Sequence, residues 1–205
     1  MNINIINPTI PSRQIRARFD ESTITVYQAY NPAIAQAAVR HQTFVSPFKV
    51  ERMTWIKPSF LWMMYRSGWA TKENQERILA IRLKRSGFER ALENACLSHF
   101  DANVHRDHEQ WQSLVKHTEV RVQWDPEKNI HLQELSYRSI QIGLSGSAVR
   151  SYVNEWIVGV EDITAYCQTI RETLTAGQAE AAAAMLPAEM PYDLPPATKS
   201  IIGAF

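Results

Sequence analysis

A segment dense in aromatic and basic side chains spans residues 52–69, with the sequence RMTWIKPSFLWMMYRSGW. It contains three tryptophans, among them Trp55 and Trp62, and it also contains Lys57 and Arg66. A core segment rarely carries a lysine and an arginine among its aromatics, and a solvated face rarely carries three tryptophans. The pattern therefore predicts the wall of a pocket in which flat rings lie beside positive charge.

Two further segments that read as strands add hydrogen-bonding side chains. Residues 23–30, TITVYQAY, include Gln28 and Tyr30, and residues 135–144, LSYRSIQIGL, include Arg138, Ser139 and Gln141. Because side chains alternate between the two faces of a strand, Ser139 and Gln141 share one face and Arg138 lies on the other. Such groups beside aromatic rings suit a ligand with a flat ring, a sugar and phosphates. A sheet with polar edges would show the same residues.

Other catalytic signatures are missing from the sequence. The chain has no G-x-S-x-G elbow for a serine nucleophile and no glycine-rich phosphate loop of the G-x-G-x-x-G or Walker type. Zinc would accept the donors of one polar stretch, namely His99, Asp101, His105, Asp107 and His108. No two of these histidines are four residues apart, as a zinc-binding helix requires, so we predict a polar surface loop and no metal site.

Composition places the chain among ordinary globular proteins. Its 205 residues are 45% hydrophobic and 21% charged, which argues against disorder and against a membrane protein. Apolar runs are too short for a transmembrane helix, and residues 1–13 lack the basic and long apolar regions of a signal peptide. Cys96 and Cys167 lie far apart, so we expect no disulfide and a cytoplasmic location. A net charge of +1 argues against a surface that attracts nucleic acid as a whole.

The pattern of β-branched and apolar residues predicts alternating strands and helices. Strands are expected at residues 23–30, 52–57, 77–83, 120–124 and 135–144, and residues 157–164 read as a further strand or an extended exit. Helices are expected at residues 32–44, 60–67, 88–97 and 148–156, with a last helix from 162 or 164 to 184. Residues 98–111 read as irregular, and Asp125 with Pro126 reads as a turn that ends a strand. This order predicts an α+β fold on one or two small sheets.

Local signals mark where helices begin and where the domain ends. Asn31 before Pro32 and Ser59 before Phe60 are helix starts, and Gly68 is a helix stop. We expect a single α+β domain over residues 12–175 and, over residues 176–205, an Ala-rich and Pro-rich helix end and tail. Four prolines between residues 187 and 196 exclude regular helix or central strand there. The tail is either disordered or an arm laid against a neighbouring surface, and its apolar end favours docking.

Several segments resemble the family known as domain of unknown function 4291, found in bacteria and fungi. The resemblance is carried by QIRARFDESTITVYQAYNPAIA, RMTWIKPSFLWMMYRSGWATKENQERILAI, VQWDP and YRSIQIGLSGSAV. It covers roughly residues 12–170, and the segment after about residue 175 lies outside it. The family's name assigns no activity.

The order of the elements is similar, more distantly, to the ADP-ribosyltransferase fold, which includes small bacterial DNA-modifying toxins and the tRNA 2′-phosphotransferases. The likeness is carried by the strand VYQAY, the helix NPAIAQAAV, the strand MTWIKPSF with its immediate helix, the strand ILAIRL and the closing strand YRSIQIGL. This resemblance implies small sheets with flanking helices and NAD as the cofactor. It also implies that the first and fifth strands belong to one central sheet region and flank one cleft.

Site residues follow from the same resemblance. In that superfamily the first strand gives a His or Arg to the NAD ribose, the second a Tyr or Ser beside the nicotinamide, and the fifth a Glu for the ribose 2′-hydroxyl. The matching positions here are Gln28, then Lys57 or Ser59, then Ser139 or Gln141. Gln141 departs from the pattern, because a neutral amide does not stabilise positive charge on the ribose as a carboxylate does. Two alternatives remain: Glu134 reaches in from the start of the same strand, or the cations Arg16, Lys57, Arg66 and Arg138 handle a phosphate as in the phosphotransferases.

These observations lead to one leading function and one competitor. We expect an ADP-ribosyltransferase-like protein that binds NAD or a related nucleotide, modifies a nucleic acid or a protein, and holds Lys57 and Arg138 in one pocket. The catalytic candidates are Gln141, Glu134 and Lys57, and the nucleotide-binding candidates are Arg16, Gln28, Tyr30, Trp55, Ser59, Trp62, Arg66, Arg138 and Ser139. The competitor is a non-catalytic module that binds single-stranded nucleic acid by aromatic stacking and basic contacts.

Overall fold

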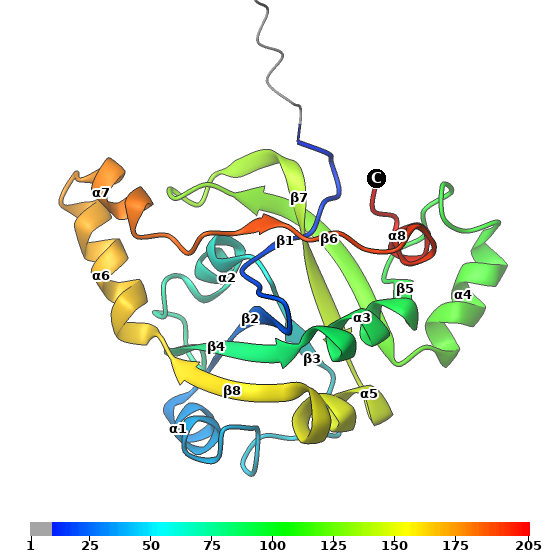
Figure 1. Ribbon diagram of the computed structural model, residues 1–205, viewed down its shortest axis with the longest axis horizontal. Helices are drawn as coiled ribbons and strands as arrows, with labels where there is room; N and C mark the ends of the chain where they lie inside the picture. Colours follow the sequence, from blue (N-terminus) through cyan, green and yellow to red (C-terminus); the bar gives the residue numbers. More distant parts are fainter. Residues whose placement is uncertain (1–9) are drawn as a thin grey trace, which may run out of the picture.

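The computed structural model describes residues 10–205 and arranges them as small sheets flanked by helices (Figure 1). This confirms the mixed α+β class. The strands are β1 (Arg16–Ala17), β2 (Thr23–Tyr30), β3 (Thr54–Ile56), β4 (Arg77–Lys84), β5 (Ala95–Leu97), β6 (Val120–Lys128), β7 (Glu134–Leu144), β8 (Ile157–Asp162) and β9 (Met190–Pro191). The helices are α1 (Pro32–His41), α2 (Phe60–Ser67), α3 (Arg85–Glu93), α4 (His108–His117), α5 (Gly146–Ser151), α6 (Thr164–Thr175), α7 (Ala179–Ala184) and α8 (Pro196–Ile202), with a π-helical turn, η1, at Tyr152–Trp156.

The strands form two main sheets that meet at a single bridge. One sheet has the order β2-β4-β8 and is antiparallel throughout. The other has the order β3-β7-β6-β5, in which only β5 and β6 run parallel. Tyr27 on β2 joins the two, because its backbone N–H donates to the carbonyl of Lys57 at 2.7 Å. The first and fifth predicted strands, β2 and β7, lie in different sheets, whereas we expected one central sheet region. The reason is that β3 pairs with β7 and lies between it and β2.

Helix ends follow the local signals in the sequence. The Asn31 side chain accepts a hydrogen bond from the Ile34 N–H, and Pro32 takes the first helical position of α1. Ser59 Oγ accepts from the Trp62 N–H and begins α2. Gly68 ends α2 in the left-handed conformation, with a φ of 61°, which glycine adopts without strain. These three predicted boundaries are confirmed.

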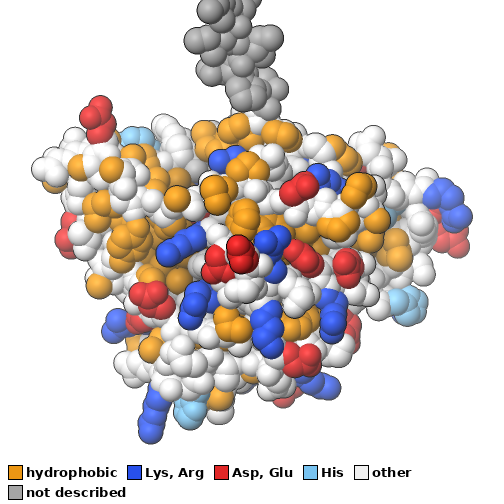
Figure 2. Space-filling model, in the orientation of Figure 1, with side chains coloured by type: hydrophobic (Ala, Val, Ile, Leu, Met, Phe, Trp, Pro, Cys, Tyr) orange, Lys and Arg blue, Asp and Glu red, His pale blue; other side chains and the backbone are white. Residues whose placement is uncertain are grey.

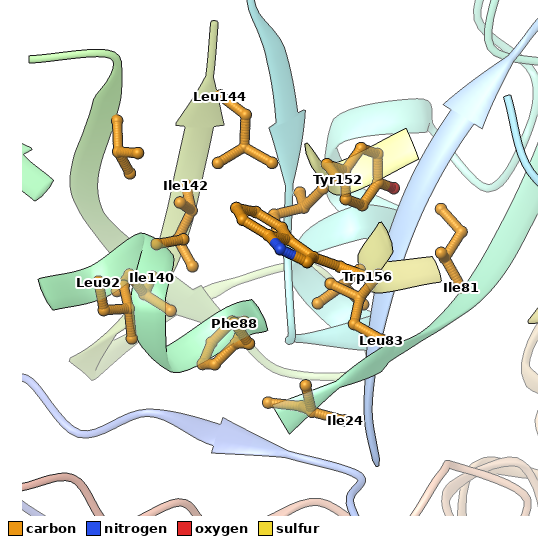
Figure 3. Close-up of a cluster of buried hydrophobic side chains, with 14 of the residues drawn as sticks. Ile24, Ile81, Leu83, Phe88, Leu92, Ile140, Ile142, Leu144, Tyr152 and Trp156 are labelled. Carbon is orange, nitrogen blue, oxygen red and sulfur yellow. The ribbon is translucent and has the colours of Figure 1, made fainter. Parts of the chain in front are cut away.

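The main hydrophobic core lies between the two sheets and is closed by α3 and η1. Figure 3 shows Trp156 at its centre, with Leu144 and Tyr152 on one side and Phe88 on the other. Trp156 packs on Gly87 in α3 so closely that a Cβ at Gly87 would stand 2.4 Å from Trp156 Cγ. The glycine, in the first turn of α3, is therefore required by packing.

The C-terminal segment is docked, which decides between the two alternatives for the tail. Strand β9 pairs with β1, and Tyr192, Leu194 and Ile202 are buried in the main core. The carbonyl of Ile202 accepts a hydrogen bond of 2.7 Å from Trp124 Nε1. In Figure 1 this segment crosses the molecule from α7 to α8 beside β1. We call residues 187–205 the C-terminal arm.

Several predicted elements differ from the structure. Strand β6 continues through Asp125 and Pro126 to Lys128, because its pairing with β7 outlasts the turn preference of that dipeptide. The expected helix to residue 184 breaks at Gly177, which has a φ of 80°, into α6 and α7. Residues 98–111, which read as irregular, include the start of α4, which is capped by Asp107. The helix expected over 88–97 ends at Glu93. The segment expected as a helix over 148–156 is α5 followed by η1.

Surface charge and hydropathy agree with the composition. Figure 2 shows basic and acidic side chains interspersed on the face toward the viewer. Among residues 10–205 there is no helix of sufficient length and apolar character to span a bilayer. Cys96 and Cys167 are both buried as free thiols. Most of the stretch examined for a signal peptide, residues 1–9, lies outside the described residues.

Candidate functional site

A cleft of about 420 Å³ opens where β2, β3 and α2 meet the ends of β6 and β7. We call it the Lys57 cleft. Seven of the predicted site residues line it, namely Gln28, Tyr30, Trp55, Lys57, Trp62, Arg66 and Gln141. Three other polar residues line the cleft but were not predicted from the sequence, namely Thr54, Gln75 and Gln123. The cleft thus draws on both sheets, even though β2 and β7 are not in one sheet.

Lys57 has the most unusual environment in the cleft. Its side chain is only 6% exposed, and its Nζ donates one hydrogen bond, of 3.2 Å, to the carbonyl of Trp55. The Nζ lies 5.5 Å from the centre of the Trp62 ring. Within residues 10–205, no carboxylate lies within ion-pair distance of it. Burial, together with the nearby charge of Arg66, lowers the pKa of Lys57 to about 7, while Asp125 acts in the opposite direction.

Helix α2 places an aromatic ring and a cation on the same wall. Trp62 and Arg66 are four residues apart and therefore lie on one face of the helix. The Arg66 side chain is exposed, and no ion pair of it exists within the described part of the chain. A guanidinium in this position is free to bind a carboxylate or a phosphate from solution.

The start of α2 is held by carboxylates from distant parts of the chain. Ser59 Oγ donates to Glu127 Oε1 at 2.9 Å, and Glu189 of the C-terminal arm accepts a hydrogen bond of 2.7 Å from the Phe60 N–H. Burial, and then the nearby Glu127, raise the pKa of Glu189 to about 8, against the opposing effect of the Phe60 hydrogen bond. Ser59, a predicted site residue, is thus buried in this anchor and does not line the Lys57 cleft.

Gln28 anchors one side of the cleft and is already fully engaged. Its Nε2 lies 2.6 Å from Thr54 Oγ1 and 2.9 Å from the Tyr30 hydroxyl. Its Oε1 accepts a hydrogen bond of 2.7 Å from the Tyr152 hydroxyl. Burial raises the pKa of Tyr30 to about 12, so this hydroxyl stays protonated at neutral pH. This network fixes the position of β2 against β3 and gives the cleft a rigid wall.

The carboxylate beside Gln141 is Asp125 and not the predicted Glu134. Asp125 Oδ2 accepts a hydrogen bond of 2.6 Å from Gln141 Nε2, and Asp125 Oδ1 accepts one of 2.8 Å from Gln123 Nε2. Gln123 and Gln141 are directly paired across β6 and β7, so both reach Asp125 from the same face of the sheet. The alternation of Gln123 and Asp125 was the signal that could have found this residue, but the predicted strand ended at Trp124, before the turn read at Asp125 and Pro126.

Gly143 gives Trp55 its place on the neighbouring strand. The two residues are paired across β3 and β7. A Cβ at Gly143 would stand 3.0 Å from Trp55 Cε2 and 2.8 Å from Met53 Sδ. The Trp55 indole therefore lies over the backbone of Gly143, which has no side chain. Any larger residue at position 143 would push the indole from the cleft wall.

Arg138 lies away from the Lys57 cleft, so its predicted place beside Lys57 is wrong. Its side chain is exposed and its Nη1 donates to the carbonyl of Trp124 at 3.0 Å. It lines a separate hollow of about 200 Å³ with Arg13 and Asp101. Strand alternation explains the separation, because Arg138 and Gln141 point to opposite faces of β7. Ser139, on the Gln141 face, is buried but does not line the cleft.

Glu134 and Arg16 are also outside the cleft. Glu134 begins β7, seven residues before Gln141, which corresponds to about 23 Å along a strand. Its side chain is 68% exposed and forms an ion pair of 3.1 Å with Lys128. Arg16 lies on β1, and its Nη2 donates to the backbone carbonyl of Glu189 at 3.3 Å. Neither residue is in position to act on a ligand in the Lys57 cleft.

Three further regions bear on the choice of site. A hollow of about 600 Å³ adjoins the Lys57 cleft, shares Tyr30 and Arg66 with it, and adds Lys49 and Arg52. A hollow of about 590 Å³ beside β4 and β8 has Arg18, Arg82, Asp20 and Glu161 in its lining and no tryptophan. The three histidines of the loop and α4 do not converge: across residues 10–205 there is no group of three metal-binding side chains. Their lack of a metal role remains a prediction.

The comparisons bear on family and not on activity. A search of curated proteins finds no match to the chain. One family model matches residues 14–192, and its description is Domain of unknown function (DUF4291). The match begins near β1 and extends through β9, so it includes part of the C-terminal arm that the resemblance had left out. The chain belongs to the DUF4291 family.

Proposed function

We propose that the Lys57 cleft binds NAD or a related nucleotide. The observation that carries the proposal is the pair of cations Lys57 and Arg66, which face one cleft beside tryptophan rings and have no carboxylate partner in the described chain. A buried cation without an anionic partner is costly, so an anion from a ligand would relieve a cost that the fold otherwise bears. A cleft of about 420 Å³ is within the range of small-molecule sites.

Each part of a nucleotide has a matching surface in the cleft. Trp55 and Trp62 offer faces for a flat ring. Arg66 carries a permanent charge for a phosphate. Lys57, with its pKa near neutrality, would take up a proton when a phosphate arrives, so its charge would come with the ligand. The amides of Gln75 and Gln123 are hydrogen-bonding groups suited to ribose hydroxyls.

The transfer of ADP-ribose to a nucleic acid or a protein is the activity that this ligand would serve. Breaking the bond between nicotinamide and ribose builds positive charge on the sugar, which a carboxylate stabilises. Gln141 cannot supply it, but Asp125 lies 2.6 Å from the Gln141 amide. We propose that Asp125, which contacts the lining residues Gln123 and Gln141 but does not itself line the cleft, is the carboxylate of the site and that these two amides hold it in place.

Binding of single-stranded nucleic acid is the competing function. It is favoured by the adjoining hollow, which extends the row of cations from Arg66 to Lys49 and Arg52. Glu73 lies in the same hollow and opposes that charge. A mononucleotide fills the Lys57 cleft alone, whereas an oligonucleotide needs both hollows, so the length of the ligand separates the two functions.

The test is calorimetric titration with NAD, ADP-ribose, AMP and a short oligonucleotide. Arg66→Ala should weaken NAD or ADP-ribose binding roughly ten- to a hundred-fold, as expected for the loss of one charge-assisted contact. Arg138→Ala is the matched control, an exposed arginine outside the cleft, and should leave affinity unchanged. Asp125→Asn should preserve binding and abolish release of nicotinamide. Tight oligonucleotide binding that depends on Lys49 and Arg52, with no mononucleotide binding, would favour the competitor and refute the proposal.

A further inference from the structure

We propose that Lys57 is a nucleophilic amine that forms an imine with the aldehyde of a short sugar phosphate. This inference deepens the proposed function, since it rests on an anionic ligand occupying the same cleft, but it does not require that ligand to be a nucleotide. It assigns Lys57 a covalent role in place of a purely electrostatic one.

The geometry of Lys57 is that of an amine available for reaction. Its Nζ makes a single hydrogen bond, to the carbonyl of Trp55, and that carbonyl also accepts from Gln28 Nε2 at 3.1 Å. The amine can therefore leave the carbonyl without stranding a buried acceptor. Lys57 lines the cleft although it is 94% buried, so packing restricts its side chain at the cleft wall.

A second buried lysine shows what a structural role would look like. Lys128 is as deeply buried as Lys57, but its Nζ forms an ion pair of 3.1 Å with Glu134 and lies 4.0 Å from the centre of the Tyr65 ring. Lys128 does not line any of the hollows around the Lys57 cleft. The fold thus neutralises one buried lysine with a carboxylate and leaves the other without one.

The reaction is balanced with water as the only other product. The Nζ lone pair adds to the carbonyl carbon, and the carbonyl π electrons move to oxygen. The oxygen takes a proton from solvent and the nitrogen releases one to solvent, which gives a neutral carbinolamine with a lone pair on nitrogen. A second proton converts the hydroxyl into leaving water as the nitrogen lone pair forms the C=N bond. The sum is one aldehyde, one neutral amine and one proton, giving a protonated imine and water. Burial keeps a large fraction of Lys57 neutral near pH 7, which this step requires.

The lining of the cleft selects the class of aldehyde. Arg66 offers a guanidinium for a phosphate, and Gln75 and Gln123 offer amides for hydroxyls. Asp125 is already held by two glutamine amides, which leaves its charge partly satisfied. A polyhydroxylated aldehyde with one phosphate meets these groups better than an apolar aldehyde, because the wall beyond the tryptophans is polar.

Reductive trapping tests the inference. The protein is incubated with glyceraldehyde 3-phosphate and sodium cyanoborohydride at pH 7, and modified lysines are located by peptide mass spectrometry. Lys57 should be modified at least about tenfold faster than exposed Lys116, because an ordinary exposed lysine is almost entirely protonated at this pH. Lys57→Met and Lys57→Arg should lose that adduct, and circular dichroism confirms that each variant is folded. Glyceraldehyde without phosphate, and the Arg66→Ala variant, should each react more slowly.

The pH profile gives a second readout. The charged or titratable groups that face Lys57 are Arg66 on α2, Asp125 on β6 and Tyr30 on β2. Adduct formation at Lys57 should reach half of its maximum near pH 7. Equal modification of Lys57 and Lys116 throughout, or none at Lys57 in folded protein, would overturn the inference. Nucleotide titrations on the same samples report separately on the proposed function, which can hold when trapping fails.

Discussion

Replacing Lys57 with methionine should make the protein more stable at neutral pH. The pKa of this amine falls from 10.5 to about 7 in the folded chain, and each pKa unit corresponds to about 1.36 kcal/mol, so the ammonium form costs the fold about 4–5 kcal/mol. Methionine has a similar shape and no charge. It gives up a contact with the Trp62 ring worth about 1–2 kcal/mol and one hydrogen bond worth about 1 kcal/mol. The net gain at pH 7 should be about 1–3 kcal/mol.

The gain should depend on pH in a definite direction. The folded pKa lies below the unfolded one, so the destabilisation is absent above about pH 10.5, grows as the pH falls toward 7, and is constant below 7. At pH 10 the electrostatic part of the gain should be only about 1 kcal/mol. At that pH Lys57 is neutral in the folded chain, so methionine gives up only the hydrogen bond to the Trp55 carbonyl, worth about 1 kcal/mol, and this loss offsets the gain. The two proteins should therefore be of nearly equal stability at high pH and clearly different at neutral pH.

Urea denaturation at pH 7 and pH 10 measures this difference. Lys128→Met is the matched control, since Lys128 is equally buried but paired with Glu134. It should give no gain at either pH. If Lys57→Met is destabilising at pH 7, or if its effect is the same at both pH values, Lys57 is not an unpaired buried cation and the argument for the cleft fails.

Two other predictions concern stability. Gly87→Ala should destabilise the protein, because the new Cβ would stand 2.4 Å from the Trp156 ring. The overpacking costs about 1–3 kcal/mol, which exceeds the helix-propensity gain of about 1 kcal/mol. Equal or greater stability in urea would contradict this prediction. Glu189→Gln should flatten the pH dependence of thermal stability, because the raised pKa of Glu189 gives a contribution that is fully present below pH 4.5 and is lost as the pH rises through about 8. Melting temperatures at pH 5.5 and pH 8.5 measure this, and an unchanged slope in the variant would count against it.

Features set by local chemistry were predictable from the sequence. Asn31, Ser59 and Gly68 mark helix ends because their hydrogen bonds or backbone angles involve neighbours within four residues. Trp62 and Arg66 could be assigned to one wall because helical spacing is local too. The pocket expected from residues 52–69 is present as a cleft for the same reason.

Features set by pairing between distant segments were not predictable in this way. Asp125 was read as part of a turn, because its neighbour Pro126 favours one, but β7 pairs with both residues and tolerates the proline next to a bulge. Arg138 was placed in the pocket for its charge, even though the alternation already noted in the sequence sets it on the opposite face of its strand from Gln141. No short window of sequence predicts the separation of the two sheets. The same holds for the contacts of the C-terminal arm with β1 and with the start of α2.

The contact between Glu189 and the start of α2 determines which part of the site can fold last during synthesis of the chain. Glu189 follows Gln141, the last residue of the cleft, by 48 positions in the chain. At about 5–20 residues per second, a ribosome needs seconds to make that stretch. A nascent chain can therefore bring together the segments that line the cleft before the Glu189 carboxyl group that caps Phe60 exists. Helix α2, which carries Trp62 and Arg66, would be the last part of the site to become stably folded. Newly made protein should therefore gain ligand affinity only after the C-terminal arm has been translated.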